Sequence, residues 1–352
     1  MRAAILQGGE FSVADLPDPK PEQGQVLVSP LFNGICGSDL HTRDFSREAA
    51  AQVSADERTS LPRFVLGHEF SAEVLAIGPR TESPVKVGDR VVSLPFAKGP
   101  KGWEAIGSQT YVGGLATRAV VIADRCYAIP KTIPDDLAAL TEPLAVGLHA
   151  VNLANRNRGP NVIIGCGPVG LAVLLALKGQ GRGPILAADF SPERRALAEA
   201  LGADIVVDPA QTSPYAHWGD LGFTPSPISP LLEREMLRQP PGVNIFECVG
   251  ARGLLDQMIK NAPVHSHIIV VGVCSHVDHH RPVQAIVREL TVEYSFAYRP
   301  NEFDASLRMI GDFPDRVAKL ITSRRPLAET GFAFDALATS PREAKILINP
   351  HA

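Results

Sequence analysis

Residues 161–170 read NVIIGCGPVG, a β-branched run that leads into three glycines with the spacing GxGxxG. Alone this spacing is a weak signal in a chain with 30 glycines, but here a strand-like run precedes it and an apolar helix-like run, 168–179, follows it. In this setting Gly165 permits a tight turn, Gly167 lets the backbone approach a pyrophosphate, and Gly170 lets helix and strand pack closely. The stretch therefore predicts a dinucleotide-binding loop, with the helix N-terminus supplying N–H groups to the phosphates.

An acidic residue supports this interpretation, because Asp189 follows Gly170 by 19 residues and ends the strand-like run PILAAD. Its carboxylate can accept the ribose hydroxyls and should repel a 2′-phosphate, which favours NAD over NADP. Arg194 and Arg195 lie just downstream and weaken that exclusion, Arg194 as a cofactor contact, although exposed helix surface is their plainer interpretation. Cys166 is expected to be a small buried filler. The other expected cofactor contacts are Pro168, Val169, Val271 and Val273.

Strand-like and helix-like runs alternate through the middle of the chain, residues 147–289. Further buried strands are predicted at DIVVD (204–208), NIFECVG (244–250) and HIIVVGV (267–273). Ser191 followed by Pro192 suits a helix N-cap and first turn. The proline-rich segment 209–241 interrupts the pattern and is expected to contain a helix over 231–238. The alternation predicts an α/β fold with a doubly wound parallel sheet.

The first part of the chain is β-rich instead. Short β-branched runs lie between turn residues, at 25–29, 72–77, 90–94 and 118–122. A charged segment, 42–63, is expected to be a helix-like or loop excursion on the surface. The tail returns to mixed α and β texture.

Composition excludes several classes of protein. The 352-residue chain has a formal net charge of −4 and no basic stripe, which argues against a nucleic-acid partner. Its five cysteines are odd in number and widely spaced, which indicates reduced thiols and a cytoplasmic location. We find neither a signal-peptide core nor an apolar run of membrane-spanning length.

Three short stretches carry metal-binding side chains: NGICGSDLHTRD (33–44) contains Cys36, GHEF contains His68 and Glu69, and TEP contains Glu142. Judged alone, each has an ordinary explanation, as a buried thiol, a core histidine or a helix-start carboxylate. Together, one thiolate, one imidazole and one carboxylate suit a zinc ion with three protein ligands and an open fourth position.

The motifs GICGSDLH, GHEF, VGDRVV, TEPLAVGLHA and GCGPVG, in this order, resemble those of the zinc-dependent medium-chain alcohol dehydrogenases. The similarity is greatest to the branch of sorbitol, threonine and butanediol dehydrogenases, and it extends over nearly the whole chain. It implies a GroES-like catalytic domain built from residues 1–146 and 290–352, with a Rossmann NAD-binding domain, 147–289, between its two parts.

The resemblance also implies roles for residues of the site. Cys36 and His68 match zinc ligands, whereas Glu69 and Glu142 each match a carboxylate that binds the metal directly or stands beside it. We expect Cys36, His68 and Glu142 to be bound at least part of the time, with Glu69 exchanging in and so taking part in catalysis. Asp39 matches a carboxylate that orients a ligand imidazole.

Ser38 and His41 match a proton relay, with a surface histidine as the alternative for His41. The spacing from Cys36 to His68 is longer than in the family, so 42–63 is expected to add a loop near the pocket mouth. Residues 93–114 contain no cysteine where many relatives bind a second zinc, and we expect no structural zinc.

The implied activity is reversible oxidation of an alcohol, more specifically a secondary alcohol or polyol, by NAD in a homodimer or homotetramer. The alternatives are a zinc-free quinone or enone reductase of the same fold, a non-catalytic nucleotide-binding protein, and a cysteine hydrolase built on Cys36 and His68. Two other histidine features are expected to be structural: the solvated loop CSHVDHHRP (274–282) and His149 in the core.

Overall fold

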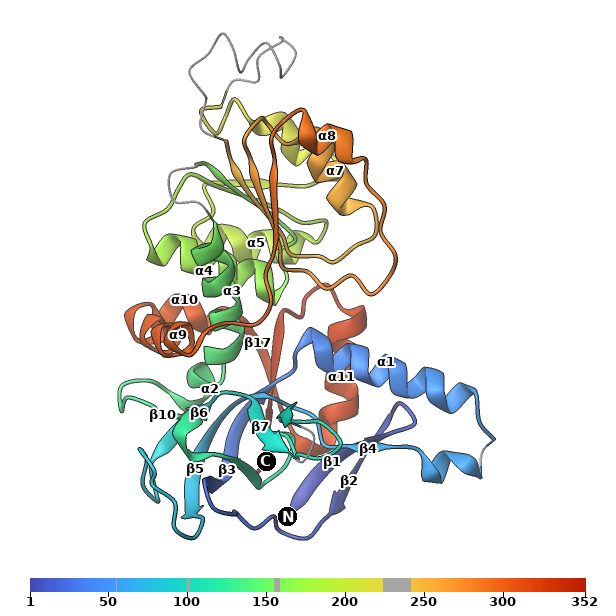
Figure 1. The fold of residues 1–352 in the computed structure, drawn as a ribbon, viewed down its shortest axis with the longest axis vertical. Coiled ribbons are helices and arrows are strands. Elements are labelled where there is room, and N and C mark those ends of the chain that lie inside the picture. The colour runs from blue at the N-terminus through green and yellow to red at the C-terminus, as the bar shows by residue number, and fades with distance from the viewer. Residues whose placement is uncertain (55, 100–101, 155–158, 224–241) are drawn as a thin grey trace. The chain divides into compact units, whose positions relative to one another are not determined.

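The computed structural model describes residues 1–54, 56–99, 102–154, 159–223 and 242–352. The chain forms two compact units, Met1–Glu142 with Phe303–Ala352, and Pro143–Glu302. Both ends of the chain therefore belong to one unit, as the blue and red segments of Figure 1 show. The helix predicted over 231–238 lies outside the described residues.

The first unit is built on a mixed seven-stranded sheet. Its strand order is β10-β6-β5-β3-β18-β17, and β9 also pairs with β3. The strands are β3 (Gln25–Gly34), β5 (Glu69–Ile77), β6 (Arg90–Ser93), β9 (Ala119–Ile122), β10 (Cys126–Ala128), β17 (Ile321–Pro326) and β18 (Lys345–Asn349). The final strand thus lies beside β3, one of the first, and a buried aliphatic cluster packs against the sheet.

Smaller elements complete this unit (Figure 1). A three-stranded sheet, β2-β1-β4, and the hairpin β7–β8 comprise β1 (Arg2–Gln7), β2 (Glu10–Asp15), β4 (Arg63–Phe64), β7 (Phe96–Gly99) and β8 (Gly102–Ala105). The helices are α1 (Gly37–Ala51), α2 (Asp135–Ala138), α10 (Pro314–Ala318) and α11 (Thr330–Thr339). Short 3₁₀ turns are η1 (Glu57–Ser60), η2 (Ala123–Arg125) and η4 (Leu327–Glu329).

The described residues of the segment 42–63 are mostly helical, which agrees with the helix-like alternative for this segment, while its position near a pocket mouth stays a prediction. The segment continues α1 to Ala51 and then runs through η1 into β4. The buried Arg43 anchors the helix, because its guanidinium donates to Asp335 of α11 at 2.8 Å and lies over the ring of Phe334. Helix-favouring Ala, Arg and Glu residues account for the continuation of α1 through this segment.

The second unit is a parallel six-stranded sheet with helices in its connections. The strand order is β13-β12-β11-β14-β15-β16, with β11 (Asn161–Ile164), β12 (Ile185–Ala188), β13 (Ile205–Val207), β14 (Asn244–Glu247), β15 (His267–Val270) and β16 (Thr291–Tyr294). Its helical segments are α4 (Pro168–Gly179), α5 (Pro192–Leu201), η3 (Pro214–His217), α7 (Leu254–Asn261) and α8 (Pro282–Ile286). This is the predicted doubly wound α/β architecture.

The boundaries between the units differ from those predicted. The second unit ends at Glu302 rather than at residue 289, because β16 pairs with β15 as a sixth parallel strand. The boundary at 142/143 falls inside α3 (Thr141–Leu153), and the boundary at 302/303 inside α9 (Pro300–Asp312). A helix that continues across a boundary leaves no compositional break for the sequence to display.

Among the described residues, we find no helix that combines the length and the apolar character needed to cross a membrane.

Candidate metal centre and dinucleotide site

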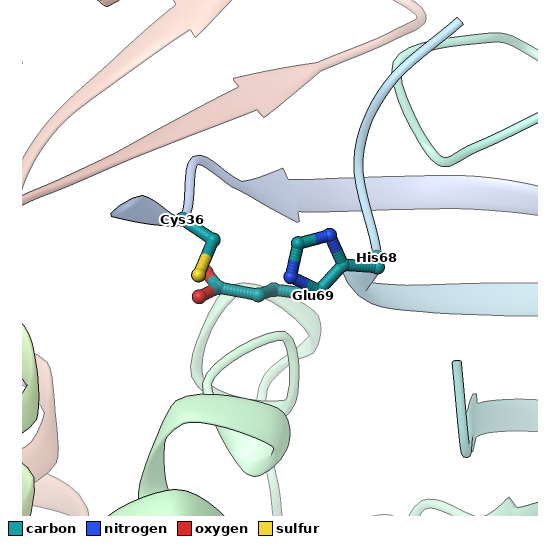
Figure 2. Close-up of side chains that lie close together, drawn as sticks. All are labelled: Cys36, His68 and Glu69. Atoms are coloured by element: carbon teal, nitrogen blue, oxygen red, sulfur yellow. The ribbon is translucent and has the colours of Figure 1, made fainter. Parts of the chain in front are cut away.

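Three of the predicted metal-binding side chains converge in the first unit. One ligand atom each from Cys36, His68 and Glu69 lie within 4.8 Å of one another, and Figure 2 shows the three side chains pointing toward one another. Cys36 follows the end of β3, while His68 and Glu69 stand at the start of β5. The two strands are antiparallel neighbours, with Gly34 opposite Glu69, so their register brings the motifs together.

The donor set suits zinc. A thiolate, an imidazole and a carboxylate are all common zinc ligands, whereas Mg²⁺ and Ca²⁺ prefer oxygen alone. Within the part of the chain that the structure describes, no other group of three such side chains is this close together. The loop histidines His276, His279 and His280 are exposed and form no such group.

Glu142 opens α3 and is half-buried in the same unit. It is not one of the three residues within 4.8 Å. Its negative charge nevertheless helps to raise the pKa of Lys345, the residue that contacts Glu69. Glu142 therefore lies within electrostatic range of the group formed by the other three.

Sequence reasoning missed Lys345. Its Nζ lies 2.6 and 2.9 Å from the two carboxylate oxygens of Glu69 and donates to the carbonyl oxygen of Ile35 at 2.9 Å. Burial lowers the pKa of Lys345, but the charges of Glu69, Cys36 and Glu142 outweigh this and raise the pKa overall. The one available signal was a lysine at the start of the apolar strand KILIN, which indicates a buried charge that needs a partner. The partner, Glu69, lies 276 residues away in sequence, so the pattern does not identify it.

Asp39 supports the imidazole, as predicted for a carboxylate next to a ligand histidine. Its Oδ1 is 3.4 Å from Nδ1 of His68, and its Oδ2 accepts the backbone N–H of Cys36 at 3.0 Å. Burial lowers the pKa of His68, yet the Asp39 carboxylate and the Cys36 side chain raise it well above its usual value. The site thus stabilises positive charge at the position of the imidazole.

Ser38 and His41 lie on the first two turns of α1, directly after Cys36. Both are exposed, and their spacing of three residues places them on the same side of the helix. Either side chain is therefore accessible to a bound molecule or to solvent.

The glycine loop has the geometry predicted for a dinucleotide site. Gly165 has a φ of +95°, and a Cβ on Gly170 would lie 1.9 Å from the carbonyl oxygen of Gly165. A Cβ on Gly167 would meet no atom within 4 Å, so space is open there. Gly167 is the N-cap of α4 and Pro168 its first residue, so the helix N-terminus begins at the loop, followed by Val169.

Asp189 closes the loop from the next strand. Its two oxygens accept the backbone N–H groups of Cys166 at 2.7 Å and Ser191 at 2.8 Å. Burial is the main reason that the pKa of Cys166 rises to about 12, which agrees with its predicted role as an unreactive filler. The predicted N-cap is also confirmed, since the Ser191 side chain accepts the N–H of Arg194.

The remaining predicted cofactor contacts differ in exposure. Arg194 is half-buried, and its charge reaches Cys166 of the loop. The neighbouring Arg195 pairs with Asp208 at 3.1 Å. Val271 is buried and Val273 exposed, directly after β15.

His149 belongs to the core of the second unit, as predicted. It is 8% exposed, and its Nδ1 lies 2.8 Å from Oε2 of Glu302. Asn152 and the backbone N–H of Arg299 also donate to Glu302. Burial raises the pKa of Glu302, but these contacts lower it by a larger amount, so the pKa lies below its ordinary value.

Comparisons with known proteins cover both units. Residues 22–131 match the alcohol dehydrogenase GroES-like domain family, and residues 168–312 match the zinc-binding dehydrogenase family. The (R,R)-butanediol dehydrogenase of Bacillus subtilis is 30% identical over 360 residues, covering 97% of each chain. Human sorbitol dehydrogenase is 28% identical over 93% of this chain and 89% of its own. The crystal structure of the Bacillus subtilis 2R,3R-butanediol dehydrogenase superposes with a TM-score of 0.80, at 28% identity and 99% coverage of both chains.

Proposed function

The chain belongs to the zinc-dependent medium-chain alcohol dehydrogenase superfamily, and we propose that it oxidises a secondary alcohol or polyol reversibly with NAD. It is an oxidoreductase acting on CH–OH groups, as its relatives are. The observation that carries the proposal is the convergence of Cys36, His68 and Glu69 within 4.8 Å. A zinc-free reductase of this fold, a non-catalytic nucleotide-binding protein or a cysteine hydrolase does not explain why one chain carries both this three-residue group and a dinucleotide loop.

One zinc ion would be held by Cys36, His68 and Glu142, with Glu69 exchanging in. The mixed sulfur, nitrogen and oxygen donors and the carboxylate beside the imidazole support zinc as the metal. Bound there, zinc would act as a Lewis acid that makes an alcohol proton easier to remove near neutral pH. We propose no second zinc, because residues 93–114 contain no cysteine.

Ser38 and His41 would carry the substrate proton outward. A hydroxyl can accept a proton on one side and donate one on the other, so Ser38 suits an inner position. His41 is exposed on the same helix and can exchange protons with water near neutral pH. Asp39 would keep the His68 imidazole in one orientation throughout.

NAD would bind with its pyrophosphate at the Gly165–Gly170 turn and its adenosine ribose at Asp189. The cofactor supplies the hydride acceptor. The Asp189 carboxylate favours ribose hydroxyls over a 2′-phosphate, with Arg194 beside it as the group most able to relax that preference. Val271 and Val273 would border the cofactor from the end of β15.

The substrate class follows from the relatives, two of which are named for butanediol and for sorbitol. We propose a small hydroxylated substrate. A cytoplasmic location is supported by the five free thiols. We also propose a homodimer or homotetramer. Sedimentation velocity on the purified protein would determine the oligomeric state.

Metal analysis combined with an absorbance screen tests the proposal. The screen follows reduced nicotinamide while NAD and NADP are each offered with a panel of diols, polyols and simple secondary alcohols. We expect about one zinc per chain and NAD-dependent turnover of a secondary alcohol or polyol. Protein with less than about half an equivalent of zinc, prepared without chelators, would contradict the proposed catalytic ion.

A further inference from the structure

Two neighbouring arginines of α5, Arg194 and Arg195, are held in different ways. Nη1 of Arg195 donates to the carbonyl oxygens of Asp189 and Phe190, both at 2.8 Å. Nη2 of the same side chain lies 3.1 Å from Oδ2 of Asp208. For Arg194, in contrast, Nε is buried and has no hydrogen-bond partner among the described residues. Arg195 is therefore fixed to the protein on two sides, whereas Arg194 keeps a donor for a bound molecule.

The ion pair of Arg195 with Asp208 lies next to the residue proposed to bind the ribose. Strands β12 and β13 are parallel neighbours, and Ala188 pairs with Val207. The residues that follow, Asp189 and Asp208, therefore leave the sheet side by side at its carboxyl edge, where parallel sheets of this kind bind their ligands. The guanidinium of Arg195 contacts both of these turns.

A cation at this position bears on the choice of cofactor. NADP differs from NAD by a phosphate on the 2′-oxygen of the ribose, and an arginine beside the ribose is the common partner of that phosphate. Arg195 has the right charge, but it reaches a phosphate only after breaking its present contacts. Those contacts include a charge-assisted bond between side chains that are each only 18% exposed.

Resting on the proposed use of NAD, we propose that Asp208 is a positioning residue for cofactor choice. It favours NAD because it keeps the guanidinium of Arg195 away from the position of a 2′-phosphate. Asp189 repels that phosphate directly, whereas Asp208 withholds the cation that would attract it. Two carboxylates thus act on the same selection by different routes, and Asp208 does so without contacting the cofactor.

The variant Asp208→Asn separates the ion pair from the turn that contains it. Oδ1 of Asp208 accepts the backbone N–H of Ala210 at 3.0 Å, and the asparagine oxygen should keep this bond. Its amide NH₂ then faces the donors of Arg195, and two donors form no hydrogen bond. The guanidinium should be released, and the ratio of the Kd for NADPH to the Kd for NADH should fall by roughly 10-fold or more, the scale of one hydrogen bond to a charged group.

Titration of the purified protein with NADH and with NADPH, followed by nicotinamide fluorescence, measures both dissociation constants. Glu199→Gln is the matched control, because it removes one negative charge from an exposed position of the same helix and should leave the ratio of the two constants unchanged. The double variant Asp208→Asn/Arg195→Gln should return the ratio to that of the original protein.

Two results would overturn the proposal. An unchanged ratio in Asp208→Asn would show that the ion pair only stabilises the fold. A double variant that keeps the gain in NADPH binding would show that the lost negative charge, and not the released Arg195, changes the selection.

Arg195→Gln alone keeps the test decisive if Asp208→Asn does not fold. Arg195 is held away from the phosphate, so its loss should not change the ratio of the two constants. A selective loss of NADPH binding in Arg195→Gln would show that Arg195 already contacts the phosphate, which contradicts the proposal.

These titrations need neither zinc nor an alcohol. A failed activity screen would therefore contradict the proposed function and leave the assignment of Asp208 standing. An original protein that binds neither reduced cofactor would overturn both.

Discussion

The carboxylate of Asp39 lies 3.4 Å from the imidazole of His68. The other oxygen of Asp39 accepts the N–H of Cys36, so one side chain orients a candidate ligand and fixes the start of α1. Two positions of the metal centre therefore depend on a residue that is not itself a ligand.

Asp39→Asn should weaken zinc binding by about 10–100-fold, the usual effect of neutralising a carboxylate behind a ligand histidine. The asparagine oxygen can still accept the Cys36 N–H, so the start of the helix should persist. Chelator competition measures the affinity. Asp44→Asn, on the exposed side of the same helix, is the control, and equal weakening in both variants would contradict the role of Asp39.

Cys36→Ala should abolish both stoichiometric zinc and turnover, because the thiolate is the softest donor of the set. Metal analysis and the reduced-nicotinamide assay measure the two effects on the same samples. Cys274→Ser, in the second unit, should retain both. Full zinc content in Cys36→Ala would remove the cysteine from the ligand set.

Ser38→Ala should reduce turnover by about 10²–10⁴-fold, the range for losing a positioned proton-transfer group. Zinc content should not change, since the hydroxyl is not expected to bind the metal. Steady-state kinetics and metal analysis separate these outcomes, with the exposed Ser60→Ala as control. Loss of zinc together with turnover would show that Ser38 supports the metal centre instead of carrying a proton.

Asp189→Asn should narrow the preference for NAD over NADP. The charge that disfavours a 2′-phosphate disappears, and a charge-assisted bond to the ribose is lost, which corresponds to roughly 10-fold or more in kcat/KM for NAD. Comparing kcat/KM with both cofactors measures the change. Glu199→Gln on the exposed face of α5 controls for net charge; an unchanged ratio in Asp189→Asn would place the ribose elsewhere.

The pKa of Glu302 is lowered on folding, so its network stabilises the protein fully above the ordinary glutamate pKa near 4.5. That stability is lost as the pH falls through the lowered pKa. In Glu302→Gln the free energy of unfolding at pH 7 should therefore fall by about 1–3 kcal/mol. Its decrease toward acid pH should also be less steep than in the original protein. Thermal unfolding at several pH values measures this; equal slopes for both proteins would contradict the assigned pKa direction.

The local features of the fold were predictable because their signals are short. The GxGxxG turn, the N-cap at Ser191 and the strand-like runs of the second unit each depend on neighbouring residues, and the structure confirms them. The unit boundaries were not predictable, because α3 and α9 continue through them. The sequence left the charged segment 42–63 open between helix and loop, because local propensity does not show that Arg43 contacts Asp335 and Phe334 of α11.

The three side chains that converge at the candidate site were predictable from the sequence, but the lysine that contacts one of them was not. Cys36, His68 and Glu69 carry recognisable motifs, and the register of β3 with β5 brings them together. Lys345 lies outside those motifs, and its contact with Glu69 exists only because the last strand pairs with β3. A pairing across so much sequence depends on tertiary packing, which no local pattern encodes.

The position of β18 at the end of the chain also means that the parts of the metal centre are translated at different times. The strands that carry Cys36 and Glu69 leave the ribosome early, but the strand that carries Lys345 follows the entire second unit. The second unit, Pro143–Glu302, is complete before Lys345 is translated, and domains generally fold as units during synthesis. Until residue 345 emerges, Glu69 lacks the ammonium partner that it has in the folded protein.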